Sequence, residues 1–185
     1  AHPGSRAAGV HNSPISFAVP GPEDRGPLVL DMATSIAAFG KVMVAGDKGE
    51  SIPDTWALDE HGDPTTDPAA ARTLRPAGEY KGYGLALLFE CFTGLMAANP
   101  LVSPNILSDK TGPAQPGAQN SFLCAVDVTM FGDLVDYRQE VEDLIRAEKS
   151  LPRQDGVEEI FVPGDPELRT LQERTRDGEK LVKPR

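Results

Sequence analysis

Histidine and cysteine are scarce in this sequence, which limits the metal and nucleophile chemistry open to it. The three histidines, His2, His11 and His61, are isolated from one another, and Cys91 and Cys124 form no C-x-x-C pair. Zinc sites need such ligands clustered at short spacings, so we expect no protein-bound metal. Both cysteines lie in apolar stretches, where we expect small core residues of a protein kept in a reducing compartment.

Basic residues and long apolar runs are also few. The chain carries 18 Lys and Arg against 28 Asp and Glu, a net charge of −10, and no basic run is dense enough to follow a phosphate backbone. The longest apolar run, "GLALLFECFTGLMAA", contains Glu90 and is too short to span a bilayer. No stretch has the pattern of a signal peptide. We therefore expect a cytoplasmic protein that binds neither nucleic acid nor membrane.

The common nucleotide and hydrolase motifs are missing as well. "GYGLAL" begins like the dinucleotide fingerprint G-x-G-x-x-G, but Leu87 stands at its third glycine and a loop-like "RPAGEY" precedes it instead of a strand. Gly40 and Lys41 are followed by Val42, so there is no phosphate-binding loop. No serine lies in a G-x-S-x-G turn. These absences exclude a Rossmann fingerprint, a P-loop and a nucleophile elbow.

Strand and helix signals alternate along the 185 residues, which is enough chain for a sizeable core. Alternating or continuous apolar residues predict strands at 14–20, 27–32, about 56–58, 121–128 and 158–163. Periodicity of three and four predicts helices at 35–48, from 85 onward, at 134–149 and from Asp165-Pro166. The fold class expected from this order is α/β (α+β), a two-layer sandwich with a mixed sheet.

Several local features follow from residue types. The continuous apolar run at 27–32 predicts a strand covered on both faces. Thr34 or Ser35 is expected to cap the next helix, and Gly49 to end it. A wide apolar stripe from Leu85 to Met96 predicts a buried helix. Residues 99–120 have no periodicity and are expected to form an irregular connection. Three aspartates in a Gly/Pro-rich stretch are expected to form turns rather than a carboxylate cluster: Asp59, Asp63 and Asp67.

A set of stretches carries more information together than any one alone. In order, "NSPISFAVPG", "VLDMATS", "GKV", "IPDTWALDEHGDPTTDP" and "KGYGLAL" closely resemble the malate/L-lactate dehydrogenase family of NAD(P)-dependent oxidoreductases. That family also holds ureidoglycolate, sulfolactate and 2,3-diketogulonate enzymes. The resemblance is dense over residues 5 to 95 and thinner over "FLCAVDVTMFGDL" and "GVEEIFVPGDPE".

The resemblance implies a non-Rossmann fold with a largely antiparallel sheet, a homodimer, and hydride transfer between nicotinamide and a small 2-hydroxy or 2-oxo acid. It makes 1–150 the NAD(P)-binding domain and 151–185 a strand and helix that complete the cofactor site. The cofactor-contacting positions that it implies are Asp31, Met32, Ala33, Lys81, Gly164 and Asp165. A capped helix after a strand would offer unpaired N–H groups to an anion, and Gly82 and Gly84 would let a ligand approach the backbone. No ribose-selecting acid or arginine decides between NAD and NADP.

This chain also departs from the family pattern. The histidine that transfers a proton and the arginine that holds the substrate carboxylate lie in a portion preceding the matched part, so we expect no catalytic residue here and place them upstream of Ala1. His11, Glu79 and the Asp54-Thr55 pair stand where glycine is common. Two function classes stay open: the cofactor-binding portion of an oxidoreductase, and a truncated, non-catalytic homologue acting as a binding or dimerisation module.

Overall fold

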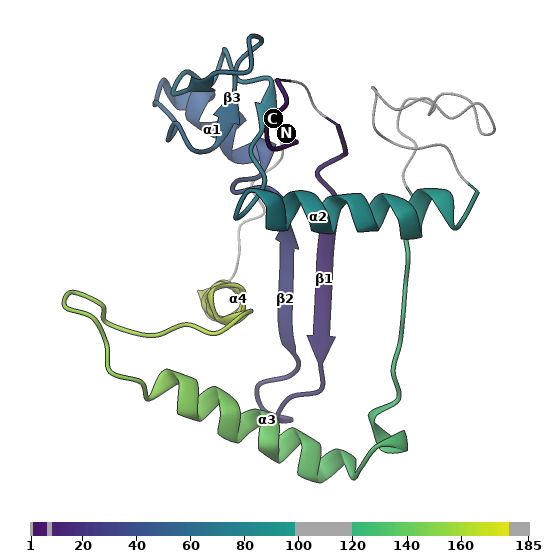
Figure 1. Ribbon diagram of the computed structural model, residues 1–185. Coiled ribbons are helices and arrows are strands. Elements are labelled where there is room, and N and C mark those ends of the chain that lie inside the picture. Colours follow the sequence, from purple (N-terminus) through teal and green to yellow (C-terminus); the bar gives the residue numbers. More distant parts are fainter. Residues whose placement is uncertain (1, 7–8, 99–119, 178–185) are drawn as a thin grey trace. The chain divides into compact units, whose positions relative to one another are not determined.

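The structure is a computed structural model that describes residues 2–6, 9–98 and 120–177. The chain forms two compact units: unit 1 contains Ala1–Ile15 and Met32–Cys124, and unit 2 contains Ser16–Asp31 and Ala125–Arg185. The elements in chain order are β1 (Pro14–Val19), β2 (Leu28–Ala33), α1 (Phe39–Lys48), β3 (Ala57–Leu58), β4 (Pro64–Thr65), β5 (Thr73–Leu74), α2 (Tyr80–Phe89), a π-helical turn (Glu90–Leu95), a 3₁₀ turn (Val128–Met130), α3 (Leu134–Lys149) and α4 (Asp165–Asp177) (Figure 1).

Two small sheets account for the strands. β1 and β2 form a two-stranded sheet, and their arrows point in opposite directions in Figure 1. β3 lies between β4 and β5 in an antiparallel sheet, with Ala57 opposite Thr65 on one side and Leu74 on the other. The predicted mixture of helices with antiparallel strands is confirmed, while the two-layer sandwich stays a prediction. Leu30 in β2 is 38% exposed, so the expectation of a strand covered on both faces is wrong.

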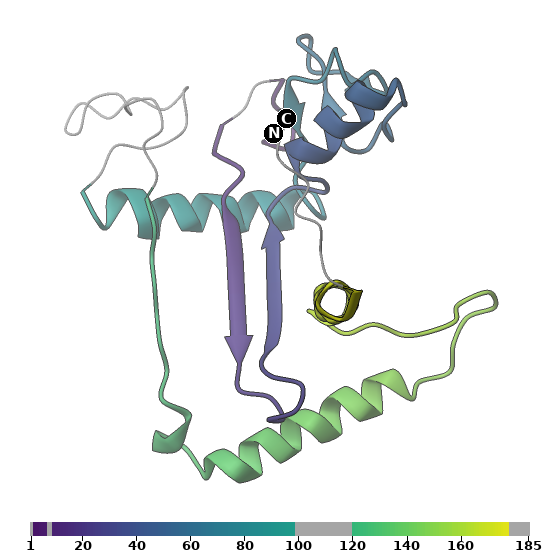
Figure 2. The ribbon, with the colours of Figure 1, turned by 180° about the vertical axis from the view of Figure 1, so that it is seen from behind.

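The core of unit 1 forms where α1 packs beside the three-stranded sheet, as both Figure 1 and Figure 2 show. Its fully buried members are Val42, Ile52, Ala57 and Ala71, against which Ala45, Trp56 and Leu74 pack. α1 begins at Phe39, four residues later than predicted, and its N-cap residue Ala38 makes no side-chain cap. The Ser35 hydroxyl instead donates to the carbonyl of Ala37 at 2.6 Å, so the predicted cap is wrong. Gly49 ends α1 in the left-handed conformation, as expected.

α2 differs most from the sequence prediction. It begins at Tyr80, and its buried residues, together with those of the following π-helical turn, are Gly82, Ala86, Glu90 and Gly94. The predicted apolar stripe faces outward, with Leu88 54% and Met96 61% exposed. Because Gly82 on the buried face of α2 has no side chain, the backbone of Thr34 and Ala77 can lie directly against the helix there. The expectation that the stripe from Leu85 to Met96 lies in a core is therefore wrong. Phe89 is half-buried and Phe92 stacks on Phe122 with ring centroids 5.3 Å apart, but the stripe as a whole is not part of a core in the described chain.

Unit 2 confirms two predicted helices. α3 spans the expected residues and buries Val141 and Ile145, and α4 begins at Asp165. The strands expected at 121–128 and 158–163 are wrong, because both segments lack strand pairing over the residues described. Cys91 and Cys124, expected in the core, are exposed.

The remaining local predictions have mixed outcomes. Asp59 accepts backbone N–H groups from His61 and Asp63 at 2.9 and 3.0 Å, and Asp67 accepts one from Ala69 at 2.9 Å, which confirms both as turn residues. The connection expected at 99–120 lies, except for its last residue, outside the described residues. No helix within the described ranges is long and apolar enough to cross a bilayer.

Candidate functional site

In unit 1 the residues after β2 are hydrogen-bonded to the residues before α2. The Ala77 N–H donates to the Thr34 carbonyl at 2.9 Å, and the Ile36 N–H donates to the Arg75 carbonyl at 2.9 Å. Thr34 is 2% exposed, and its hydroxyl donates to Asn12 Oδ1 at 3.3 Å. Asn12 and Thr34 lie in two of the stretches that carry the family resemblance, and Ala77 lies shortly before a third. Segments far apart in the sequence therefore meet at one junction.

The two glycines of α2 have different roles at this junction. A Cβ on Gly82 would lie 2.4 Å from the Thr34 carbonyl oxygen and 2.6 Å from the Ala77 nitrogen, which is closer than any side chain tolerates. A Cβ on Gly84 would meet nothing within 4 Å. Gly82 is thus required for packing inside the chain, and only Gly84 leaves backbone accessible to something outside it.

Glu79, which precedes α2, has an unusual backbone. Its φ of 53° and ψ of −104° lie in a region that side chains rarely adopt, and the preceding Gly78 also has a positive φ. A non-glycine residue in such a region stores roughly 1 to 3 kcal/mol of strain. The resemblance implies that glycine is common at this position, and the backbone of Glu79 gives a conformational reason for it.

Lys81 is the second residue of α2 and is exposed. Within the described residues no hydrogen bond or ion pair holds its ammonium group, so the charge is available to a ligand. The first turn of α2 has fewer free donors than expected, because the Lys81 and Gly82 N–H groups donate to Gly78 and Ala77 carbonyls at 3.1 and 2.8 Å. An anion near Lys81 would therefore be met mainly by the side chain.

The other candidates of this group lie at the end of β2. Asp31 is exposed and belongs to unit 2, whereas Met32 and Ala33 are half-buried and belong to unit 1. Ala33 adjoins Thr34, so the junction brings it near the start of α2. The N–H groups of α1 do not follow directly, because residues 34–38 separate β2 from that helix. The expected anion site at a helix following the strand is therefore not formed there.

A cavity of about 220 Å³ opens at the same junction. Gly82 and Ala86 of α2 form part of its wall. Its polar lining residues in the described chain are His11, Asn12, Thr34, Ser35, Arg72, Thr73 and Tyr83. None of the six predicted cofactor residues lines it. The sequence reasoning missed the polar lining, although four of its members stand inside stretches that carry the resemblance, namely Asn12, Thr34, Ser35 and Tyr83.

Gly164 and Asp165 form a second group within unit 2. Gly164 has a φ of 86° and packs directly on β2, where an added Cβ would lie 3.2 Å from the Val29 carbonyl oxygen. Asp165 is 9% exposed. Its carboxylate accepts from Arg25 Nη2 at 2.9 Å, from Lys149 Nζ at 3.0 Å and from the Val162 N–H at 3.0 Å.

These contacts determine the ionisation of Asp165. Burial by itself raises the pKa, but the Arg25 guanidinium, the Val162 N–H and Lys149 outweigh it and lower the pKa of Asp165 to about 2. The pKa of Lys149 is raised, first by its hydrogen bond to Asp165 and then by Glu159. Both groups stay charged at neutral pH, and the Asp165 side chain is fully engaged within the chain.

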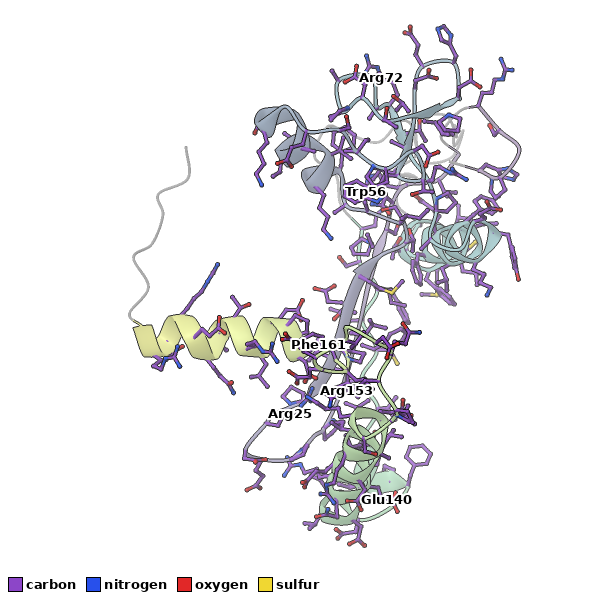
Figure 3. The ribbon with its side chains drawn as sticks, turned by 90° about the vertical axis from the view of Figure 1, so that its left-hand side faces the viewer. Arg25, Trp56, Arg72, Glu140, Arg153 and Phe161 are labelled. Carbon is purple, nitrogen blue, oxygen red and sulfur yellow. The ribbon has the colours of Figure 1, made fainter. Side chains whose placement is uncertain are left out.

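Arg25, Lys149 and Asp165 form an ion-pair cluster. Further charged residues join this cluster to α4. Arg169 pairs with Glu159 and lies over the Phe161 ring at 4.8 Å from its centroid, and Lys149 bridges Glu159 and Asp165. Figure 3 labels Arg25 and Phe161 near the first turn of α4. The cluster thus fixes the start of α4. Gly164, in the same loop, can offer a ligand its backbone.

No group of three or more His, Cys, Asp or Glu side chains suited to a metal ion occurs among the described residues. The chemistry that the candidate groups support is recognition of an anionic organic ligand, through the exposed Lys81 and the polar cavity.

Comparison with known proteins identifies the family of the chain. Residues 1–184 match the family described as malate/L-lactate dehydrogenase, and the chain belongs to this family. It is 38% identical over 177 residues to the (2R)-3-sulfolactate dehydrogenase (NADP⁺) of Chromohalobacter salexigens, covering 93% of this chain and 48% of that protein. It is 31% identical over 171 residues to the ureidoglycolate dehydrogenase (NAD⁺) of Escherichia coli O157:H7, covering 92% and 48%.

A solved structure gives the same picture for the fold. The sulfolactate dehydrogenase of Methanocaldococcus jannaschii superposes with a TM-score of 0.69 at 30% identity, covering 93% of this chain and 48% of that one. The chain spans about half the length of the relatives that it matches. The family assignment therefore applies to a chain that matches about half of each relative. The activity of the whole protein is a proposal.

Proposed function

We propose that this chain is the cofactor-binding portion of an NAD(P)-dependent oxidoreductase that transfers a hydride between nicotinamide and a small 2-hydroxy or 2-oxo acid. The observation that carries the proposal is the junction in unit 1. There the residues that follow β2 are hydrogen-bonded to the residues that precede α2, beside an exposed lysine without a partner among the described residues. The names of the relatives, which include NAD⁺ and NADP⁺ enzymes acting on hydroxy acids, support the same class.

The residues fit such a cofactor in specific ways. Lys81 offers an ammonium group to a phosphate, and the open space at Gly84 leaves room for a ligand beside the helix. Met32 and Ala33 would line the ligand from the end of β2. When bound, the nicotinamide supplies or accepts the hydride.

The remaining assignments belong to the same proposal and come from the family resemblance. Asp31, Gly164 and Asp165 are proposed as further contacts, with Gly164 contributing backbone because the Asp165 carboxylate is engaged by Arg25 and Lys149. NAD and NADP are both retained as candidates. The homodimer is likewise a proposal, which the molar mass in solution will test.

The direct test is a fluorescence titration of the 185-residue chain with NADH and with NADPH. Lys81→Ala should weaken binding by about 1 to 3 kcal/mol, which is roughly 5- to 150-fold, because a charged hydrogen-bond partner of the ligand is lost. Lys48→Ala, which removes an exposed lysine from the last turn of α1, is the matched control and should bind as the unmodified chain does. Equal affinities of the Lys81 and Lys48 variants, or no binding of either cofactor by the unmodified chain, would contradict the proposal.

A further inference from the structure

Residues 121–127 are a stretch of chain that has no strand partner in the described part of the protein. Figure 1 and Figure 2 draw the stretch as a nearly straight run that ends at the 3₁₀ turn. Its last residue, Asp127, has extended backbone angles, with φ −78° and ψ 108°. Within the described chain, no hydrogen bond engages the backbone N–H or C=O groups of residues 121–126. An unpaired backbone of this kind is a template for a strand of another chain.

The side chains of this stretch are mostly apolar and lie in water. Leu123 is 93% exposed and Val126 is 67% exposed, and Cys124 is exposed as well. Residues 121–126 carry no charge. Proteins usually protect a free strand edge with charged side chains, and a contiguous exposed apolar surface marks an interaction site. The stretch therefore has the properties of an interface that is not yet covered.

A second copy of the chain is the partner that this stretch fits. Each copy carries a net charge of −10, so two copies repel each other over most of their surfaces. They can approach most closely where neither has a carboxylate, and residues 121–126 meet this condition. The only acid of the stretch is Asp127 at its end.

The order of residues also suits pairing of the stretch with itself. An antiparallel pair over its full length is symmetric about the middle residue, so that Cys124 lies opposite Cys124 of the other copy. Phe122 then lies opposite Val126, an aromatic and β-branched pair of the kind that stabilises antiparallel strands. Asp127 lies opposite Ser121 and not opposite the second Asp127, so the register avoids a repulsive pair of like charges.

We propose that two copies of the chain associate through residues 121–127, which pair as antiparallel strands about a two-fold axis at Cys124. The Phe122 ring stacks on Phe92 with centroids 5.3 Å apart. This contact restrains the stretch before association and reduces the conformational entropy lost on pairing. The inference rests on the homodimer of the proposed function and assigns a surface to it. None of the six proposed cofactor contacts belongs to this surface.

The first test measures the molar mass of the full 185-residue chain by light scattering over a concentration series. The mass of the unmodified chain should approach twice that of a single chain. Val126→Lys should raise the dissociation constant at least about fivefold, because the symmetric pair loses its contact between Val126 and Phe122 twice. Val135→Lys is the matched control, since Val135 is 72% exposed in the first turn of α3, outside the stretch. It should associate as the unmodified chain does.

Thiol oxidation tests the register. In Cys91→Ser, the two Cys124 thiols should form an intermolecular disulfide when diamide takes up their two hydrogens. Opposite residues of antiparallel strands have Cα atoms about 4.5 or 5.5 Å apart, within the range of about 4.4 to 6.8 Å that disulfides need. The comparison variant combines Cys91→Ser and Cys124→Ser with Ala125→Cys. Its thiols would be on diagonal neighbours about 7 to 8 Å apart, so it should cross-link more slowly.

Four results would overturn the proposal. They are a single-chain mass at about 0.3 mM chain, which would place any association in the weak millimolar range; aggregates larger than a dimer; a dimer that Val126→Lys leaves unchanged; and equal cross-linking rates of the two cysteine variants. Far-ultraviolet circular dichroism checks that each variant keeps its helices. NADH affinity is measured on the same samples. Retained NADH binding with any of the four results would reject this surface and leave the proposed cofactor function standing.

Discussion

Replacing Asp165 with asparagine should destabilise the start of α4 in a pH-dependent way. The asparagine has nearly the shape of the protonated acid, so the substitution removes mainly the charge that Arg25 and Lys149 neutralise. A pKa lowered from 3.8 to about 2 corresponds to about 2 kcal/mol of stabilisation by the ionised form. Because Arg25 would keep a largely buried charge without its counter-ion, the loss at pH 7 should be at least about 2 kcal/mol, toward the 3 to 5 kcal/mol found for broken buried pairs.

The sign of the pH dependence follows from the direction of the shift. A lowered pKa in the folded state stabilises the protein fully above the unfolded value of 3.8, and that contribution is lost as pH falls toward about 2. The difference between the unmodified chain and Asp165→Asn should therefore be constant from pH 5 to neutrality and shrink below about pH 4.

Hydrogen exchange of the α4 amides is the appropriate assay, because two compact units need not unfold as one. Glu167→Gln removes an exposed acid from the same first turn and is the matched control, expected to cost about 0.3 to 1 kcal/mol. If the amides of α4 exchange equally fast in Asp165→Asn and Glu167→Gln, the cluster does not hold the helix and the reasoning is refuted.

Three further predictions concern α2 and are measured by urea unfolding followed at Trp56. Glu79→Gly should raise the free energy of unfolding by about 1 kcal/mol or more by relieving the backbone strain; a decrease would show that the Glu79 side chain outweighs it. Gly82→Ala should cost about 1 to 3 kcal/mol because its methyl group meets the Thr34 and Ala77 backbone, whereas Gly84→Ala should be neutral or stabilising by up to about 1 kcal/mol; the reverse order would contradict the packing. Leu88→Ala should cost less than about 1 kcal/mol, since 54% of Leu88 is exposed, and a larger loss would place the stripe in a core.

Local signals predicted those parts of the fold whose cause is local. The turn at Asp59 and the end of α1 at Gly49 depend on short-range hydrogen bonds and backbone freedom, and α3 follows its own periodicity with an Asp133 cap. The expected strands at 121–128 and 158–163 failed for the opposite reason. A strand exists only through a partner, and alternation of apolar residues does not say whether one is present.

The same distinction applies to the candidate site. Resemblance proposes Lys81 and the end of β2 as cofactor contacts. The cavity is made instead by contacts between distant segments, such as Thr34 with Asn12 and Ala77. No sequence pattern predicts that Arg72 lines the cavity, because the position of its side chain depends on a hydrogen bond to the Ala69 carbonyl in a turn. The stripe on α2 was predicted from an apolar period, yet the buried face follows Gly82 and Ala86, whose small size permits close backbone contact.

The outward apolar stripe of α2 has a consequence for calorimetry. Leu88, Leu95 and Met96 are each more than half exposed, and water around such side chains contributes a large positive heat capacity. Any association that covers them must lower the heat capacity of the system, so its enthalpy will become more negative as temperature rises. An association that covers no apolar side chain will show a nearly temperature-independent enthalpy.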